Sequence, residues 1–189
     1  MSLRIIGGKF RNRLLKSPKG EQTRPTTAMI RKAVFDICQF EIQDANFLDV
    51  FAGSGLMGIE ALSRGADKAT FIDIDRYAIR CIHENINILQ LDRQANIISG
   101  DALTALERLN KGRAQFQLIY VDPPYRQKTL NEQILHFLDS SCLVASGGIV
   151  FIEETLPIQL KSNTSLKTLV HRDTRKFGKS VLHQYRKVS

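Results

Sequence analysis

The stretch Asn46–Gly65, NFLDVFAGSGLMGIEALSRG, constrains the fold more than any other part of this sequence. Its residue pattern predicts a short apolar strand over 47–51, a glycine turn at 53–55, and a helix over 56–63 that ends at Gly65. Glycine adopts positive φ and lets a ligand approach the backbone, and the first N–H groups of a helix have no partner within the helix. The stretch therefore predicts a βα turn that holds a ligand, with a turn that holds none as the alternative.

The rest of the chain repeats this alternation of strand and helix. Continuous apolar runs predict strands over 69–72, 96–99, 116–121 and 148–152. Helical spacing of apolar residues predicts helices over 76–91, 102–109 and 129–138. Such alternation is typical of a parallel sheet covered on both faces, so we expect an α/β fold. Two final strands over 166–171 and 179–186, joined by residues 173–178, predict a hairpin at one edge of the sheet.

A further helix precedes the glycine turn. Thr26 or Thr27 can cap its start, because a hydroxyl accepts from the unpaired N–H groups there. Its buried stripe is apolar and has helical spacing: Ile30, Ala33, Val34 and Ile37. Arg31 and Lys32 fall on the other side of this helix.

Positive charge is concentrated at the two ends of the chain. Residues 1–32 hold nine Lys and Arg against one acid, and residues 161–189 hold eight against one. The body between them holds ten against seventeen, although the whole chain has a net charge of +8. This segregation favours a polyanionic partner, such as nucleic acid, held by the ends, over charge that only keeps the chain soluble.

The first 22 residues form a basic extension to a domain over 23–189. Two β runs, 3–6 and 10–15, flank Gly7-Gly8-Lys9 and predict a hairpin that docks on the body or on RNA. Four basic residues of this hairpin are candidates for RNA contact: Arg4, Lys9, Arg11 and Arg13. Arg24 lies in a rigid Pro/Thr segment and is either a contact to RNA or ligand, or a surface charge.

The cysteines and the apolar runs bear on the compartment. Cys38, Cys81 and Cys142 are odd in number and widely spaced, so they predict neither a disulfide framework nor a metal cluster. The start lacks the apolar run of a signal peptide, and no apolar stretch approaches the length of a membrane span. We expect a cytoplasmic, metal-free protein that acts as a monomer.

Acidic residues follow four of the predicted strands. Asp49, Asp73, Asp101 and Asp122 would lie at the carboxyl ends of a parallel sheet, where ligands bind in such folds. Asp73 suits a ribose, whose two hydroxyl protons a carboxylate can accept, and Asp101 can accept from an adenine amino group. Any single acid of this kind can instead cap a turn, and Asp75 is expected to compete with Asp73 or to cap the next helix.

The segment Asp122-Pro123-Pro124-Tyr125 selects among nucleotide-binding functions. Residues 53–58 match GxGxxG, the dinucleotide fingerprint, but hydride transfer has no use for DPPY. An exocyclic amine on a base is a poor nucleophile, because its lone pair is delocalised into the ring. The Asp122 carboxylate and the Pro123 carbonyl can each accept a hydrogen bond from one N–H group of this amine. The two prolines fix the backbone that carries these acceptors, and Tyr125 offers a flat face on which the base can stack. A methyl group on a sulfonium then needs only to be held in line.

These motifs resemble those of a known family. The segments RIIGGKFR (4–11), TRPTT (23–27), FLDVFAGSG (47–55), GIEALSRGA (58–66) and DPPY (122–125) are similar to those of the bacterial 16S rRNA (guanine-N2)-methyltransferases. The resemblance implies a Rossmann-like class I methyltransferase fold, with a seven-stranded, mostly parallel sheet and an antiparallel last strand. It also implies S-adenosylmethionine (AdoMet) as cofactor, S-adenosylhomocysteine as product, and 16S rRNA, free or in an assembling small subunit, as substrate. Asp73 stands where this family commonly has Glu.

The resemblance and the residue patterns together assign two sets of site residues. Catalytic residues are Asp122, Pro123, Pro124 and Tyr125. Cofactor-binding residues are Asp49, Phe51, Ala52, Gly53, Ser54, Gly55, Asp73, Ile74, Asp101 and Ala102.

Three other functions fit parts of the same pattern. An adenine-N6 DNA methyltransferase usually carries a sizeable target-recognition domain, for which 189 residues leave little room. Methylation of a protein glutamine amide explains the basic ends poorly. An RNA-binding ribosome assembly protein without turnover would have no need of an intact DPPY segment.

Overall fold

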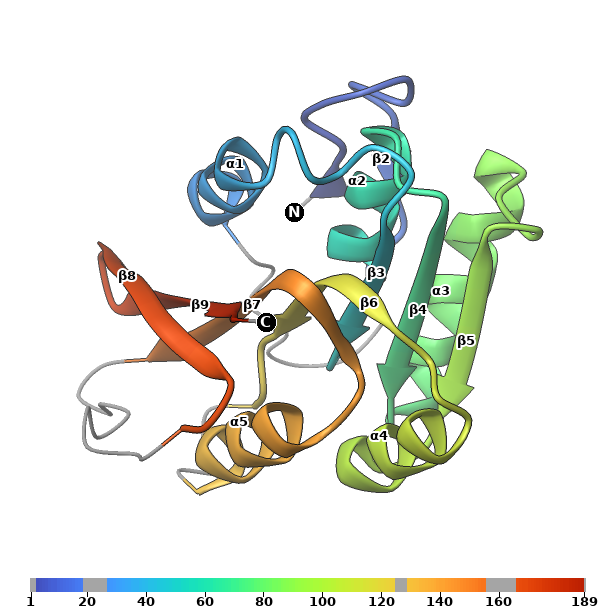
Figure 1. The fold of residues 1–189 in the computed structure, drawn as a ribbon. Coiled ribbons are helices and arrows are strands. Elements are labelled where there is room, and N and C mark those ends of the chain that lie inside the picture. The colour runs from blue at the N-terminus through green and yellow to red at the C-terminus, as the bar shows by residue number, and fades with distance from the viewer. Residues whose placement is uncertain (1–2, 19–26, 125–128, 156–165, 189) are drawn as a thin grey trace.

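A seven-stranded sheet forms the body of the protein, as the computed structural model in Figure 1 shows. The structure describes residues 3–18, 27–124, 129–155 and 166–188. The strands, in the spatial order β5-β4-β3-β6-β7-β9-β8, are β3 (Asn46–Val50), β4 (Lys68–Asp73), β5 (Ala95–Ser99), β6 (Phe116–Val121), β7 (Val144–Thr155), β8 (Leu169–Phe177) and β9 (Ser180–Lys187). Strands β3 to β7 are parallel to their neighbours in this group, whereas β9 is antiparallel to both β7 and β8. The predicted mostly parallel sheet with an antiparallel last strand is confirmed.

Helices cover both faces of this sheet. One group consists of α1 (Ala28–Ile37), α2 (Leu56–Ser63) and α3 (Arg76–Leu89), and the other of α4 (Ala102–Lys111) and α5 (Leu130–Ser140). Each helix group packs on one face of the sheet and forms a hydrophobic core there. Alternate residues of a strand point to opposite faces, so Phe47 packs in the core under α1, α2 and α3, and Leu48 in the core under α4 and α5. The same alternation turns Asp49 towards α2. Of the described helices, none is long and apolar enough to cross a membrane.

The N-terminal hairpin has shorter strands than the sequence predicts. Its strands are β1 (Leu3–Arg4) and β2 (Leu14–Leu15), and the pairing extends to Ile5, whose N donates to Arg13 O at 3.1 Å. Residues 7–12 form bends and turns. These turns dock on the end of α2, where Lys9 N donates to Ser63 O at 2.8 Å and Ser63 Oγ donates to Gly7 O at 2.6 Å. Gly8 has φ 72°, and a Cβ there would lie 1.8 Å from the Ser63 carbonyl oxygen. The glycine pair is therefore a packing requirement of the hairpin.

Arg31 is buried, although the sequence pattern places it outside the apolar stripe of α1. Its Nη1 donates to the Arg4 carbonyl at 2.9 Å and lies 3.5 Å from Oε2 of Glu60, a fully buried carboxylate on α2. Glu60 also accepts from Ile6 N and from Arg64 Nε, both at 2.9 Å. The helical pattern could not reveal this cluster, because the hairpin covers the side of α1 that the pattern leaves to solvent.

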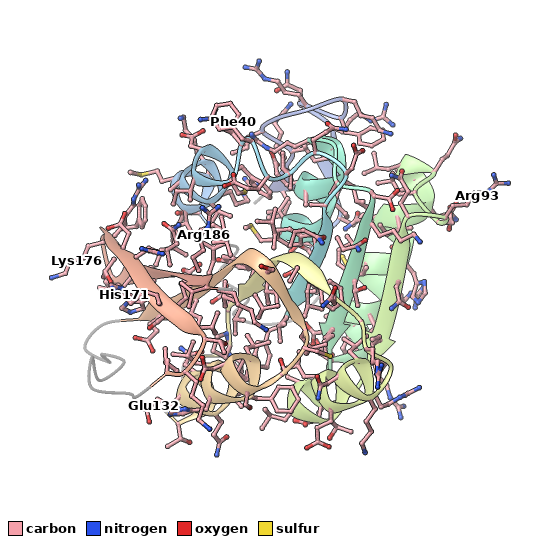
Figure 2. All side chains as sticks on the ribbon, viewed as in Figure 1. Phe40, Arg93, Glu132, His171, Lys176 and Arg186 are labelled. Atoms are coloured by element: carbon pink, nitrogen blue, oxygen red, sulfur yellow. The ribbon has the colours of Figure 1, made fainter. Side chains whose placement is uncertain are left out.

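The chain between the last two strands also differs from the prediction. The expected connection over 173–178 is wrong for most of its length, because β8 continues to Phe177 and the turn is Gly178-Lys179. Strand β8 lies at the edge of the sheet, and Lys176 on it points away from the body (Figure 2). Charged side chains are common on edge strands, because they discourage pairing with another chain. They hid this strand from a search for apolar runs.

Candidate active site

A cavity of about 380 Å³ lies beyond the carboxyl ends of β3, β4, β5 and β6. Its size is within the range of small-molecule sites. The structure places Asp49, Asp73, Asp101 and Asp122 on its wall, one from each of these four adjacent strands. The other predicted cofactor and catalytic residues that line it are Phe51, Ala52, Gly53, Ser54, Ile74, Ala102, Pro123 and Pro124.

The glycine turn between β3 and α2 is shaped by its contacts. Gly55 caps α2 with φ 78°, and unlike Gly53 and Ser54 it does not line the cavity. Gly58 allows α2 to pack closely against the sheet, since a Cβ at this position would lie 2.3 Å from the Phe71 ring. A Cβ at Gly53 would meet nothing within 4 Å, which leaves open space beside the backbone. The turn can therefore admit a ligand close to its N–H groups.

Phe51 has an unusual backbone conformation at the start of this turn. Its φ is 66°, a left-handed value that costs a non-glycine residue about 1–2 kcal/mol. The N–H groups of Phe51 and Ala52 both donate to the Ile72 carbonyl at 3.0 Å, and these bonds hold the residue in place. Strained residues of this kind cluster at ligand sites. Nothing in the sequence signalled this strain.

Asp73 holds the turn from the neighbouring strand. Its Oδ2 accepts from Gly53 N at 2.8 Å, and its Oδ1 accepts from Asp75 N at 2.9 Å. A carboxylate has about four acceptor sites, so two remain for a ligand. Asp75 itself caps α3 by accepting from Tyr77 N at 3.0 Å, which confirms its expected role as a cap.

The other two cofactor-side acids differ in exposure. Asp101 is exposed and caps α4, accepting from the N–H and hydroxyl of Thr104 at 3.0 and 3.1 Å. Asp49 is buried, and its Oδ2 accepts from Gly58 N at 2.9 Å. Burial raises the pKa of Asp49 to about 8, the Asp73 charge adds to the increase, and the Gly58 bond opposes it. Burial therefore favours the neutral form of Asp49.

The described part of the DPPY segment closes the cavity at the end of β6. Asp122 N donates to the Val50 carbonyl at 3.3 Å, which fixes the segment against β3, and the Asp122 side chain is half-buried. Tyr120 lines the cavity below, and its hydroxyl donates to the buried carboxylate of Glu153. Tyr125 and Arg24 lie outside the described residues.

The predicted RNA-binding residues lie apart from this cavity. Arg4, Lys9, Arg11 and Arg13 are exposed, and none of them lines it. The hairpin turns contact the C-terminal end of α2, whereas the cavity is lined by residues at the N-terminal end of that helix. Arg4 also has an internal partner, because its Nη1 donates to the Asn12 carbonyl at 2.9 Å.

Several cavity residues were missed by sequence reasoning. They come from the N-terminal segment, from helices α2, α3 and α5, and from the ends of strands: Leu3, Ser17, Pro18, Leu56, Met57, Ile72, Ala78, Gly100, Tyr120 and Leu130. Ser17 and Pro18 are the most informative, since the sequence placed them in the basic extension, apart from the cofactor residues.

The sheet order and the cavity at its carboxyl edge define the class of this protein: it has the Rossmann-like fold of a class I methyltransferase. Residues 3–186 match the family described as Conserved hypothetical protein 95, and the chain belongs to that family. It is an AdoMet-dependent methyltransferase related to the ribosomal RNA small subunit methyltransferase D proteins. Among the described residues, no group of three or more His, Cys, Asp or Glu could hold a metal ion.

Three relatives show how far the likeness extends. Ribosomal RNA small subunit methyltransferase D of Escherichia coli K12 is 36% identical over 151 residues, which are 80% of this chain and 74% of the relative. YlbH of Bacillus subtilis, a proposed rRNA methyltransferase, is 32% identical over 172 residues, 91% of this chain and 93% of the relative. The solved structure of Escherichia coli yhhF, a proposed methyltransferase, has a TM-score of 0.86 at 30% identity and covers 100% of this chain and 99% of its own.

Proposed function

We propose that this protein transfers the methyl group of AdoMet to the exocyclic N2 amine of a guanine in 16S rRNA. The observation that carries this proposal is the shared cavity: Asp122, Pro123 and Pro124 line the same space as Asp73 and Asp101. One end of the space thus offers acceptors for a nucleoside cofactor, and the other offers acceptors for an amine. A hydride-transferring enzyme would need no such acceptors at that end.

The cofactor end fits AdoMet group by group. Asp73 has spare acceptor sites for the ribose hydroxyls, and exposed Asp101 can accept from the adenine amino group. Asp49 lies buried beside the turn. A cation bound next to it would favour its ionised form against the effect of burial, so this acid suits the cationic amino acid part of the cofactor. The open side of Gly53 allows the ligand to reach the backbone. When bound, AdoMet supplies a methyl group activated by a sulfonium.

The catalytic end prepares the amine. The Asp122 carboxylate accepts one N–H of guanine N2 and the Pro123 carbonyl accepts the other, which draws the nitrogen lone pair out of conjugation. The prolines hold both acceptors in place before the substrate arrives, and the bond from Asp122 N to Val50 O ties them to the sheet. Tyr125 supplies the face on which the extruded base stacks.

The basic extension, residues 1–22, is proposed to hold the RNA beside the catalytic domain, residues 23–189. Within the part of the chain that the structure describes, the exposed side chains of Arg11 and Arg13 make no internal hydrogen bond like that of Arg4, so they are the stronger candidates for phosphate contact. The named relatives of the small subunit methyltransferase D group support rRNA as the partner. We propose that the protein acts as a cytoplasmic monomer on this RNA, free or in the assembling subunit.

The test uses the purified protein with isotopically labelled AdoMet and three separate substrates: naked 16S rRNA, small subunits that lack the modification, and DNA. Digestion to nucleosides then identifies the methylated base. Label in N2-methylguanosine from rRNA or subunits is the expected result. Label in N6-methyladenine from DNA would support the DNA enzyme instead, and RNA binding without transfer would support an assembly protein.

A further inference from the structure

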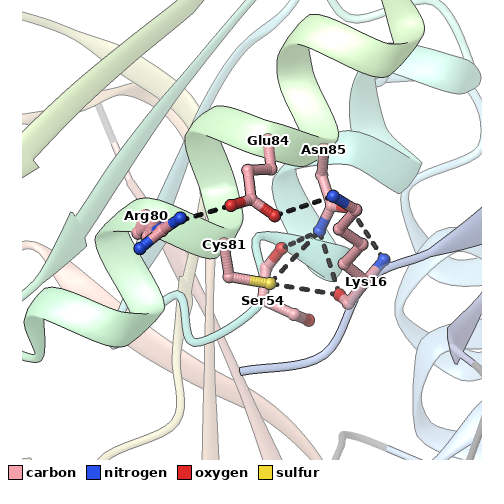
Figure 3. A network of polar contacts seen from close by, with 6 residues as sticks. All are labelled: Lys16, Ser54, Arg80, Cys81, Glu84 and Asn85. Carbon is pink, nitrogen blue, oxygen red and sulfur yellow. Dashed lines mark hydrogen bonds and ion pairs between the residues drawn. The ribbon is translucent and has the colours of Figure 1, made fainter. Parts of the chain in front are cut away.

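Asn85 bridges two segments of the chain that both form walls of the cofactor cavity. It lies on α3, and its side chain has no exposed surface. Its Oδ1 accepts from Lys16 N at 2.8 Å, and its Nδ2 donates to the carbonyls of Lys16 at 3.1 Å and of Ser54 at 3.0 Å (Figure 3). One acceptor and two donors therefore all have backbone partners.

The two segments are far apart in sequence. Ser54 belongs to the glycine turn and lies 31 residues before Asn85, and Lys16 lies 69 residues before it. Lys16 directly precedes Ser17 and Pro18, which line the cavity together with Ser54. The amide of Asn85 thus sets the distance between the end of the N-terminal hairpin and the turn.

The surface contacts around Asn85 contribute less to this link. Lys16 Nζ pairs with Glu84 at 2.9 Å and Arg80 Nε pairs with Glu84 at 3.1 Å, but these side chains are substantially exposed. Exposed ion pairs contribute little to stability. The Cys81 thiol, one turn before Asn85, donates a weaker bond to the Lys16 carbonyl at 3.2 Å. The buried amide carries most of the link.

We propose that Asn85 is a positioning residue for AdoMet: it fastens the N-terminal extension to the glycine turn, so that Ser17 and Pro18 complete the cofactor site. This inference rests on the proposed function only in taking AdoMet as the ligand of the cavity. It gives the extension a role in cofactor binding, separate from the RNA contact proposed for its basic residues. The hairpin is then part of the cofactor site rather than an arm attached to a finished enzyme.

The test compares AdoMet binding in four proteins: wild type, Asn85→Ala, Pro18→Gly and Glu84→Ala. Asn85→Ala leaves buried backbone groups without partners and should weaken AdoMet binding by about tenfold or more. Pro18→Gly leaves Asn85 intact but loosens the wall, and should weaken binding severalfold. Its melting temperature should fall by only about 1–4 °C, because glycine makes the unfolded chain more flexible. Glu84→Ala removes both surface ion pairs of the network and serves as the matched control, with unchanged affinity.

Steady-state kinetics separate positioning from a role in folding alone. In Asn85→Ala, KM for AdoMet should rise while kcat and RNA affinity stay within about twofold of wild type, because the residue acts on ground-state binding. If Asn85→Ala melts at a lower temperature but binds AdoMet as wild type does, and Pro18→Gly also binds normally, the inference is overturned. Failure of the wild-type protein to bind AdoMet would instead overturn the proposed function, and the inference with it.

Discussion

Replacement of Asp73 tests whether one carboxylate both builds the glycine turn and binds the cofactor ribose. Its two oxygens accept backbone N–H groups at 2.8 and 2.9 Å, and both keep room for a further donor. Hydrogen bonds to charged groups contribute about 1.5–3 kcal/mol each. Loss of the bond to the ribose in Asp73→Ala should therefore weaken AdoMet binding about 10- to 150-fold, at 1.4 kcal/mol per factor of ten.

The same replacement should also lower stability, by a smaller amount. Gly53 N and Asp75 N lose their acceptor, but Gly53 is only half-buried and Asp75 is exposed, so water replaces part of each bond. We expect a cost of about 1–2 kcal/mol and a melting temperature lower by about 2–8 °C. Asp73→Asn keeps one acceptor oxygen and should fall between wild type and Asp73→Ala in both properties.

Calorimetric titration with AdoMet, beside a thermal melt of each variant, measures both effects. Asp75→Ala is the control: it removes the cap of α3 and lowers the melting temperature, but should change AdoMet affinity less than Asp73→Ala does. Wild-type affinity in Asp73→Ala would refute the ribose assignment. A large loss in Asp75→Ala at the same time would transfer that role to Asp75.

Three further predictions concern other parts of the chain. Native Asp49, with its pKa raised to about 8, holds a proton that the unfolded chain releases near pH 4, so this group makes stability fall as pH rises between those values. In denaturant titrations between pH 5 and 8, the free energy of unfolding of Asp49→Asn should rise relative to that of wild type by about 1 kcal/mol per pH unit. A difference between the two proteins that stays constant over this pH range would contradict the burial argument. Joint replacement of Arg11 and Arg13 by Ala should reduce the salt dependence of rRNA binding, by a slope of about 0.7–0.9 for each phosphate that the variant no longer neutralises, without changing AdoMet affinity. Gly8→Ala should lower the melting temperature by at least about 2–4 °C, because it places a Cβ against the Ser63 carbonyl in a left-handed conformation; an unchanged melt would show that the hairpin is not docked there.

The sequence predicted those elements whose signals are local. Helix α2 begins and ends at the predicted residues, because Gly55 and Gly65 flank a mostly apolar helix. Strands β3, β4 and β6 are buried on both faces over most of their length, so their residues are mostly apolar, and the strands were found within two residues of their ends. The acids at their carboxyl ends then followed from the topology of a parallel sheet.

Features that depend on distant partners could not be predicted in this way. Arg31 is buried because Glu60 and the Arg4 carbonyl lie across α1, and no helical pattern contains that information. Most of β8 is polar because it pairs on one side only. The place of Ser17 in the cavity wall depends on Asn85, which is far away in sequence. In each case a tertiary contact overrides the local pattern.

The structure also changes what the N-terminal segment means for function. Leu3 and Leu15 are buried in the same core as the sheet, and Leu3 also lines the cavity. The exposed basic residues of the hairpin lie towards the other end of α2. The N-terminal segment therefore runs along α2 from the cavity to the exposed basic residues of the hairpin. This arrangement is consistent with the proposed RNA substrate, which would extend well beyond the modified base.

Single-turnover methyl transfer by Asp122 variants tests the central claim most directly. The assay uses saturating AdoMet and the RNA substrate that the labelling experiment identifies, with a thermal melt of each variant. Asp122→Ala removes one acceptor for the amine, and the rate should fall on the order of a hundredfold while AdoMet affinity and stability change little. Asp122→Asn is the matched control, because its carbonyl oxygen still accepts an N–H bond, and it should keep most of the rate. A folded Asp122→Ala protein that transfers methyl at nearly the wild-type rate would contradict activation of an exocyclic amine by this segment, and would reduce DPPY to a rigid turn.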